Sequence, residues 1–264
     1  MDDATRLTCL SLADQLAEAA RAETLTYFRR PDIATDNKLE SGFDPVTEGD
    51  RAAEAAMRKL IEAQRPDDGI LGEEFGSKES KSGLTWVLDP IDGTRGYISG
   101  TPTWGTLIAL HDGAKPVLGV IDQPYIGERF VGGLGQSHLD GPRGRDALQV
   151  SKVTKLSEAT ILTTFPEVGT SEEGAKFHAV AERCKLTRYG MDCYGYALLA
   201  LGQVELVVEA GLQPYDIQAP IAVVEAAGGI VTDWSGGSAD GGGRALAAAT
   251  PELHAAALEI LGQV

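Results

Sequence analysis

The sequence predicts an α/β protein with an α+β layered architecture, in which helices cover sheets. In the first half, two amphipathic helical patterns come before several short apolar runs with turn residues between them. In the second half, apolar runs alternate with helical patterns. Such alternation is typical of layers of helix packed on sheet. The length of 264 residues allows one large domain or two lobes.

The first half begins with two predicted helices. The first continues to Tyr27, and its apolar face is predicted from the helical spacing of Leu7, Leu10, Ala13, Ala17 and Ala20. The second begins after Thr47, an expected N-cap with Asp50 three residues later. Its apolar positions are Ala53, Met57, Leu60 and Ile61. An antiparallel sheet is then expected, with strands at Thr85–Asp89, Thr106–Leu110, Pro116–Gln123 and Arg129–Gly133.

A change of architecture is expected in the middle of the chain. Glycine, proline and charge coincide at Gly141–Arg145, which predicts a boundary between an N-terminal α+β lobe, residues 1–140, and a C-terminal α/β lobe, residues 141–264. Strands are expected in the second lobe at Thr160–Thr164, Lys185–Gly190, Val204–Glu209, Gly229–Asp233 and Leu246–Thr250. Helices are expected at Asp192–Leu201, at Tyr215–Ala227 and from Pro251 onward. Pro220 lacks an N–H, so the middle helix should start late or kink.

The composition excludes several classes of partner. With 39 acidic and 23 basic residues the net charge is −16, which repels nucleic acid and anionic lipid, so neither is an expected partner. Phosphorylated metabolites are repelled too, unless a bound cation reverses the local field. The three cysteines have no CxxC spacing, which favours a reducing cytoplasm over a disulfide framework or a zinc site. The first thirty residues are too charged for a signal peptide, and no stretch is apolar enough to span a membrane.

Four acidic positions share one feature, because each lies where a predicted element begins or ends. Asp89 and Asp92 bracket Pro90 at the end of a strand, Glu73 follows a short apolar stretch, and Asp216 stands at the head of a helix. Carboxylate oxygens without nearby histidine or thiolate select a hard cation, magnesium before zinc. The Ile91 carbonyl can supply a further ligand. The pattern therefore predicts a magnesium site.

A phosphate site is expected directly beside these carboxylates. Gly93 and Thr94 would form the first turn of a helix, whose free N–H groups and positive dipole end bind phosphate. Two cations about 3.5–4 Å apart can activate a water molecule and stabilise the leaving oxygen in an in-line displacement. The expected chemistry is the metal-dependent hydrolysis of a phosphate ester.

Each acidic residue also has a purely structural interpretation. Asp92 could cap a helix in a common Asp-Gly turn, and Asp216 could be an N-cap. Glu73 and Glu74 could be solvated loop charges, and Asp50 is satisfied as a capping residue. A coincidence of the four positions Glu73, Asp89, Asp92 and Asp216 is improbable, so we favour the metal site.

The motifs together resemble those of the inositol monophosphatase superfamily, whose members are magnesium-dependent and lithium-sensitive. The resemblance rests on "GEE", "WVLDPIDGT", "YDIQAPIAVVEAAGG" and the segment Asp44–Glu54, and it runs through most of the chain. It implies an αβαβα sandwich of the inositol monophosphatase and fructose-1,6-bisphosphatase type. It also implies a cytoplasmic homodimer and hydrolysis of a small phosphate monoester, with two or three Mg²⁺ ions per site and inhibition by Li⁺.

Within that superfamily the chain is similar to histidinol-phosphate phosphatases, on the residues after "DGT" and around Asp192. The resemblance implies roles for individual residues. The implied metal ligands are Glu73, Asp89, the Ile91 carbonyl, Asp92 and Asp216. Thr94, Glu73 and Asp50 would orient the attacking water. Phosphate and alcohol would be bound by Gly93, Thr94, Arg95, Asp192, Glu209 and Asp216.

Three functions stay open at this point. The first is a Mg²⁺-dependent phosphatase of L-histidinol phosphate in histidine biosynthesis, and the second is an inositol-1-monophosphatase or related sugar-phosphate phosphatase. The third, a non-catalytic relative, is disfavoured because the set of expected ligands is intact. Asp192 bears on the choice between the first two, and its structural alternative is the N-cap of the helix that follows it.

Overall fold

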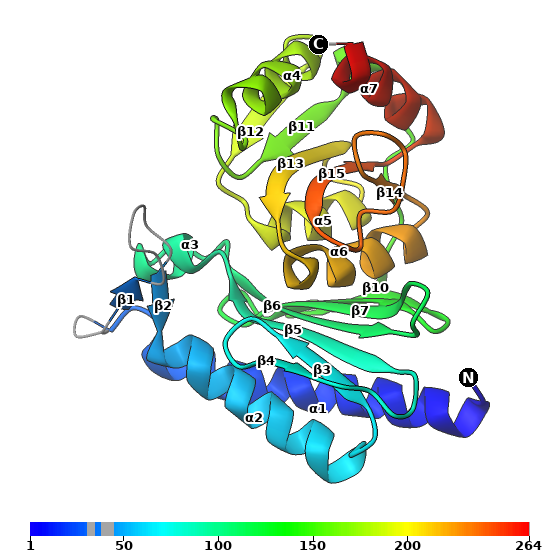
Figure 1. The fold of residues 1–264 in the computed structure, drawn as a ribbon. Helices are drawn as coiled ribbons and strands as arrows, with labels where there is room; N and C mark the ends of the chain where they lie inside the picture. The colour runs from blue at the N-terminus through cyan, green and yellow to red at the C-terminus, as the bar shows by residue number, and fades with distance from the viewer. Residues whose placement is uncertain (31–34, 38–44, 264) are drawn as a thin grey trace.

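The computed structural model describes residues 1–30, 35–37 and 45–263 and has five layers, helix on sheet on helix on sheet on helix (Figure 1). Helices α1 and α2 form one outer layer, α5 and α6 lie between the two large sheets, and α4 and α7 form the other outer layer. The predicted αβαβα sandwich is confirmed. Asp44, at the start of the Asp44–Glu54 motif, lies outside the described residues.

The first large sheet is antiparallel except at one pair. Its strand order is β10-β9-β8-β7-β6-β5-β3-β4, and only the β3–β5 pair is parallel. The strands are β3 (Gly69–Gly72), β4 (Gly76–Lys78), β5 (Thr85–Asp92), β6 (Gly105–His111), β7 (Pro116–Gln123), β8 (Glu128–Gly133), β9 (Gln136–Gly141) and β10 (Gly144–Ala147). The four strands expected from the sequence are all present. Gly141–Arg145 spans the β9–β10 hairpin turn, so the chain leaves this sheet only after Ala147.

Helices α1 (Asp3–Tyr27) and α2 (Glu48–Gln64) cover the outer face of this sheet. The apolar face of α1 is only partly as predicted. Ala13, Ala17 and Ala20 are buried, but Leu7 is exposed, and the buried stripe runs instead through Cys9, Leu12 and Leu16. The start of α2 is as predicted, because Thr47 is the N-cap of a capping box with Asp50. The two helices and the sheet share one apolar core.

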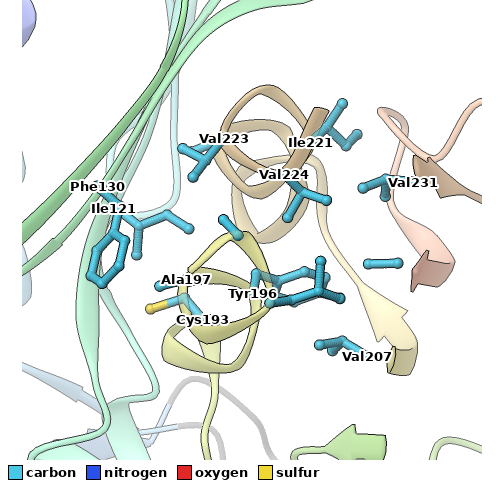
Figure 2. Close-up of a cluster of buried hydrophobic side chains, with 14 of the residues drawn as sticks. Ile121, Phe130, Cys193, Tyr196, Ala197, Val207, Ile221, Val223, Val224 and Val231 are labelled. Carbon is cyan, nitrogen blue, oxygen red and sulfur yellow. The ribbon is translucent and has the colours of Figure 1, made fainter. Parts of the chain in front are cut away.

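The central layer consists of α5 (Cys193–Ala200) and α6 (Pro214–Ala226), whose apolar side chains meet both sheets (Figure 2). Two glycines let α6 lie close to the first sheet. A Cβ added at Gly119 would collide with the Ala219 carbonyl, and one at Gly132 would collide with the Val223 backbone. Pro220 lies inside α6, and the helix does not start late, since it already begins at Pro214.

The second large sheet has the order β12-β11-β13-β15-β14. Its strands are β11 (Thr160–Thr163), β12 (Leu186–Tyr189), β13 (Leu206–Leu212), β14 (Ile230–Thr232) and β15 (Gly243–Ala248). The first three in that order are parallel, and β15 pairs antiparallel with both of its neighbours. A short 3₁₀ turn, η1 (Leu156–Glu158), precedes β11, while α4 (Ser171–Ala181) and α7 (Pro251–Gln263) cover the outer face.

Three short elements complete the described chain. Strands β1 (Thr35–Asn37) and β2 (Pro45–Thr47) form an antiparallel pair before α2. Helix α3 (Thr94–Ile98) follows β5 directly, as the sequence predicted for Gly93 and Thr94. None of the helices in the described ranges is both long and apolar enough to cross a membrane.

Candidate active site

A cleft of about 530 Å³ opens where β5, α3, α5, β13 and α6 approach one another. The residues that line it are Glu73, Asp89, Ile91, Asp92, Gly93, Thr94, Arg95, Thr164, Phe165, Asp192, Glu209, Ala210, Gly211, Leu212, Gln213, Tyr215 and Asp216. Every residue expected to bind metal or substrate is in this set. Asp50, an expected catalytic residue, is not a lining residue, but its carboxylate lies within 4.8 Å of ligand oxygens of Glu73 and Glu74.

The carboxylates form two adjacent clusters. Carboxylate oxygens of Asp89, Asp92 and Asp216 all lie within 4.8 Å of one another, and the same holds for Asp50, Glu73 and Glu74. Asp89 connects the clusters, since the charges of Glu73, Asp92 and Asp216 all act on it. Groups so far apart in sequence converge because β5, the turn after β3 and the start of α6 meet at one edge of the first sheet.

The end of β5 has an irregular register that aims its two aspartates. The ladder with β6 shifts between Asp89 and Asp92 because Pro90 has no N–H to donate. The Pro90 carbonyl accepts from the Thr106 hydroxyl at 2.8 Å, and Asp89 Oδ1 accepts from the Ile91 N–H at 3.0 Å. The Ile91 carbonyl is directed toward α3, where it accepts from Thr94 Oγ1 at 3.1 Å.

Asp50 and Asp216 are oriented by the same device, a capping box at the start of a helix. Asp216 Oδ2 accepts from the Gln213 N–H at 2.7 Å, and Asp50 Oδ2 accepts from the Thr47 N–H at 2.8 Å. Asp216 is therefore the third residue of its helix rather than the N-cap that the structural alternative supposed. A carboxylate has two oxygens, so a cap and a ligand role are compatible in one residue.

The charges in this region are unbalanced unless a cation is present. Burial, followed by the charges of Glu73, Asp92 and Asp216, raises the pKa of Asp89 well above its usual range. Burial, followed by the charges of Asp192 and Asp216, does the same to the pKa of Asp92. Burial raises the pKa of Asp50 to about 7. Buried like charges favour protonation in this way unless a metal ion neutralises them.

The residues present fit a divalent cation. The donor set consists of carboxylate and carbonyl oxygens, which suits a hard ion. Within the part of the chain that the structure describes, Asp50 Oδ1 is buried and has no hydrogen-bond partner. An orphaned buried carboxylate oxygen costs free energy, and coordination to a cation would remove that cost.

The turn after β5 fits a phosphate group. Gly93 has φ = 83°, a left-handed conformation that favours glycine, and precedes α3 as its N-cap. A side chain at this position would also meet Asp192, because an added Cβ would lie 2.8 Å from the Asp192 Cγ. The next residues are Thr94 and Arg95, and the Arg95 guanidinium stacks 4.7 Å above the centre of the Phe165 ring.

Asp192 forms part of the opposite wall of the cleft. It precedes α5, yet among the described residues its side chain makes no capping hydrogen bond, and it is Asp92 Oδ2 that accepts from the Cys193 N–H at 2.6 Å. Within the described ranges, the Asp192 carboxylate accepts one hydrogen bond, a long one of 3.4 Å from the Thr103 hydroxyl. Burial raises the pKa of Asp192 to about 6. Asp192 thus occupies the N-cap position of α5, as the structural alternative supposed, but its side chain does not cap the helix.

Glu209 on β13 is more firmly held. Its oxygens accept from the Thr164 N–H at 2.7 Å, the Thr164 hydroxyl at 2.9 Å and the Thr163 hydroxyl at 3.1 Å. Burial raises the pKa of Glu209 to about 7. Its side chain thus both joins β11 to β13 and borders the cleft.

Sequence reasoning missed several residues of the site. Glu74 was given no role in the site, and a solvated loop charge was its structural alternative, but it belongs to the cluster with Asp50 and Glu73. Thr164 and Phe165 line the cleft just beyond the end of β11. The sequence signal for Glu74 was the pair Glu73-Glu74. Thr164 and Phe165 can be predicted as site residues only once β11 is known to lie beside β13.

Comparisons with known proteins agree with this geometry. Residues 7–264 match the model of the inositol monophosphatase family. The layered fold and the acidic cleft thus belong to the class of phosphatases that hydrolyse phosphate monoesters. Within that class, the chain belongs to the inositol monophosphatase family.

Three relatives illustrate the similarity. The bifunctional phosphatase IMPL2, chloroplastic, of Arabidopsis thaliana is 42% identical over 86% of this chain, which spans 64% of that longer protein. A histidinol-phosphatase of Chlorobaculum parvum is 38% identical, with 86% of each chain covered. The solved structure of an inositol monophosphatase from Zymomonas mobilis is also 38% identical, with a TM-score of 0.84 and 96% of each chain covered.

Proposed function

We propose that the chain hydrolyses L-histidinol phosphate to L-histidinol and phosphate, in histidine biosynthesis, with Mg²⁺ as its cofactor. The observation that supports this substrate is Asp192, a half-buried carboxylate in the cleft whose side chain makes no capping hydrogen bond to α5. Histidinol phosphate carries an ammonium group and an imidazole beside its phosphate, whereas inositol phosphate carries hydroxyls. A carboxylate that accepts a long hydrogen bond within the described chain can form a stronger, charge-assisted one with the cationic substrate.

Mg²⁺ would be held by Glu73, Asp89, the Ile91 carbonyl, Asp92 and Asp216. When bound, it supplies a cation that lowers the pKa of a water molecule and neutralises charge on the phosphoryl oxygens. The carboxylates would keep that cation at the edge of the first sheet, where Gly93 and Thr94 begin α3. The backbone N–H groups of that turn would orient the phosphate.

Thr94, Glu73 and Asp50 would orient the attacking water. The Thr94 hydroxyl donates its proton to the Ile91 carbonyl, which leaves its oxygen lone pairs to accept a hydrogen bond from water. Glu73 would accept the second proton as the oxygen attacks phosphorus. Asp50 is fixed beside Glu73 by its capping box and would help to orient Glu73 as the proton acceptor.

Asp192 and Glu209 would receive the alcohol part of the substrate. Glu209 is buried and Asp192 is half-buried on the cleft wall, and a bound ammonium group would favour the ionised forms of both carboxylates. Arg95 lies on the same wall as Phe165 and would border the phosphate. The two ends of the substrate would thus contact different elements, the phosphate the turn between β5 and α3 and the alcohol part the start of α5 and β13.

Phosphate release from a panel of monoesters tests the proposal. We expect kcat/KM for L-histidinol phosphate to exceed that for inositol 1-phosphate and for the phosphate monoester of a small uncharged alcohol. The difference should be at least about ten-fold, which is the effect of one charge-assisted hydrogen bond. A wild-type preference for inositol phosphate would replace the proposal with the second candidate below. Absence of phosphate release in Mg²⁺ from every ester would reject both.

The second candidate is an inositol-1-monophosphatase or a related sugar-phosphate phosphatase. It is favoured by the solved inositol monophosphatase, which shares as much identity with this chain as the Chlorobaculum parvum histidinol-phosphatase does. We further propose a cytoplasmic homodimer, as the family resemblance implies. Light scattering on the purified protein would measure twice the mass of 27.8 kDa if this is correct.

A further inference from the structure

Glu54 is a fully buried carboxylate on α2 that lies outside both acidic clusters. It pairs with Arg58, one turn later on the helix, whose Nε lies 2.7 Å from Glu54 Oε1. It also accepts two backbone hydrogen bonds, from the Glu74 N–H at 2.7 Å and the Phe75 N–H at 3.1 Å. These two donors lie in the turn between β3 and β4, which carries Glu73 and Glu74.

The turn is shaped around this carboxylate. Gly72 and Gly76 face each other across the β3–β4 pair, and Arg58 donates a hydrogen bond to the Gly76 carbonyl. A side chain at Gly72 would occupy the space of the Glu54 carboxylate, because an added Cβ would collide with it. Glycine at this position therefore lets the helix side chain reach the turn.

Helix α2 thus acts on one cluster in two ways. Asp50 and Glu54 are four residues apart, which places them on the same face of the helix. Asp50 belongs to the cluster with Glu73 and Glu74, and Glu54 binds the backbone of the turn that presents those two glutamates. The spacing between the members of the cluster is consequently tied to the position of the Glu54 side chain.

We propose that Glu54 is a positioning residue that sets the Mg²⁺ affinity of the site by fixing the turn that bears Glu73 and Glu74. The proposal rests on the metal-dependent function proposed above. Groups that orient metal ligands without touching the metal typically account for about 10–100-fold in affinity or activity when they are replaced. Glu54 also stabilises the fold, so the test must separate a loss of metal affinity from a general loss of stability.

The test is calorimetric titration of metal-free protein with Mg²⁺, without substrate. Glu54→Gln keeps the size of the side chain but turns an amide NH₂ toward N–H donors and removes the charge opposite Arg58. We expect its Kd for Mg²⁺ to rise by about ten-fold or more. The Mg²⁺ concentration for half-maximal phosphatase activity should rise in parallel. The value of kcat at saturating Mg²⁺ should stay within about three-fold of wild type, because Glu54 binds the backbone of the turn and belongs to neither carboxylate cluster.

Gly72→Ala is an independent probe of the same contact. It leaves Glu54 chemically intact but displaces its carboxylate, so it should weaken Mg²⁺ binding in the same direction. This variant also keeps the proposal testable if Glu54→Gln fails to fold, which far-ultraviolet circular dichroism would reveal.

Asp68→Asn is the matched control. Asp68 is another buried carboxylate paired with an arginine, since it accepts from Arg65 Nε and Nη2, both at 2.9 Å. It precedes β3, at the opposite end of the strand from Glu73. We expect Asp68→Asn to lower the melting temperature about as much as Glu54→Gln and to leave the Kd for Mg²⁺ unchanged.

The outcomes separate the two proposals. Mg²⁺ affinity that falls in Glu54→Gln and Gly72→Ala but not in Asp68→Asn supports the positioning role. Wild-type affinity in the two test variants, or an equal loss in all three, overturns it and leaves the function intact. A wild-type protein that binds no Mg²⁺ would instead refute the metal-dependent function on which the inference rests.

Discussion

At the residue scale, the carboxylates of the cleft are oriented by ordinary backbone chemistry. Asp50 and Asp216 each bind an N–H at the start of a helix, and Asp89 binds the Ile91 N–H within its own turn. One oxygen of each group is fixed in this way before any ligand arrives. Such preorganisation reduces the reorganisation needed when a cation or a phosphate binds.

Replacing Thr94 tests the proposed role of its hydroxyl. Thr94→Ala removes the acceptor that would orient the attacking water, so we expect kcat to fall by about 10²-fold while KM changes much less. Thr94→Ser is the matched control, because it restores the hydroxyl and should recover most of kcat. Steady-state kinetics with the preferred ester measures both. An unchanged kcat in Thr94→Ala would assign the hydroxyl to holding the Ile91 carbonyl alone.

Replacing Asp192 tests substrate selection. A charge-assisted hydrogen bond to the ammonium group is worth roughly 1.5–3 kcal/mol, so Asp192→Asn should lower kcat/KM for histidinol phosphate by about ten-fold or more. The kcat/KM for the phosphate monoester of a small uncharged alcohol should change little. Asp140→Asn, which alters a carboxylate paired with Arg145 outside the cleft, is the control. An equal loss with both esters in Asp192→Asn would make the residue structural.

At the scale of elements, α4 offers a prediction about pH. Glu173 accepts the Thr170 N–H in a capping box and also pairs with Arg244, and these bonds lower the pKa of Glu173 to about 2. The stabilisation is therefore complete above the unfolded pKa near 4.5 and is lost as the pH falls toward 2. Glu173→Gln should lower Tm at pH 7 by about 2–4 °C, the effect of about 1 kcal/mol in a chain of this size, after allowance for solvent screening.

The difference in Tm between wild type and Glu173→Gln should then shrink between pH 4.5 and pH 2, as measured by thermal unfolding. Glu172→Gln is the control, since it removes an equal charge one residue away that is not the capping partner. A difference that is constant with pH would show that the Glu173 charge does not stabilise α4.

The elements show which parts of the fold a sequence can predict. Local signals were sufficient for α2, whose capping box was read correctly at Thr47 and Asp50. They failed on one face of α1, where Leu7 is exposed, because helical spacing alone did not show which stripe meets the sheet. Helix α4 was missed although Thr170 and Glu173 form a capping box. The turn residues of Gly141–Arg145 were assigned to a boundary, but they close a hairpin.

The candidate site divides in the same way. Asp89, Asp92 and Thr94 could be placed because they are neighbours in one motif whose chemistry is local. The second wall could be placed only in part, because Phe165 reaches the cleft through the pairing of β11 with β13. Pairings of this kind join strands more than forty residues apart, as Leu162 and Val207 do, and no local pattern specifies them.

At the scale of the whole molecule, the cleft exists because several layers meet there. The first sheet supplies Asp89 and Asp92, the central layer supplies Asp216, and the second sheet supplies Glu209. The apolar core between the sheets, drawn in Figure 2, keeps these elements in register. Many negative charges are thereby fixed in one place, where they repel one another unless a cation is bound.

Removal of metal should make stability fall as the pH rises. Burial raises the pKa of Asp50 and of Glu209 to about 7 and that of Asp192 to about 6, and the pKa of Asp89 also lies above its usual range. These groups hold protons in the folded state that the unfolded chain has lost above pH 4. The contribution of these protonated groups to the free energy of unfolding is therefore fully present below pH 4. It falls as the pH rises from 4 through 6–7, by about 1.4 kcal/mol per pH unit for each such proton.

Thermal unfolding in chelator and in Mg²⁺, from pH 5 to pH 8, measures this effect. We expect the increase in Tm caused by Mg²⁺ to grow with pH, because the cation replaces protons that chelated protein can no longer hold. Asp89→Asn removes one of the repelling charges, so at pH 8 in chelator it should melt above wild type, although it should have lost phosphatase activity. If the Tm of wild type followed the same pH profile in chelator as in Mg²⁺, the buried carboxylates would not be the site at which the metal binds.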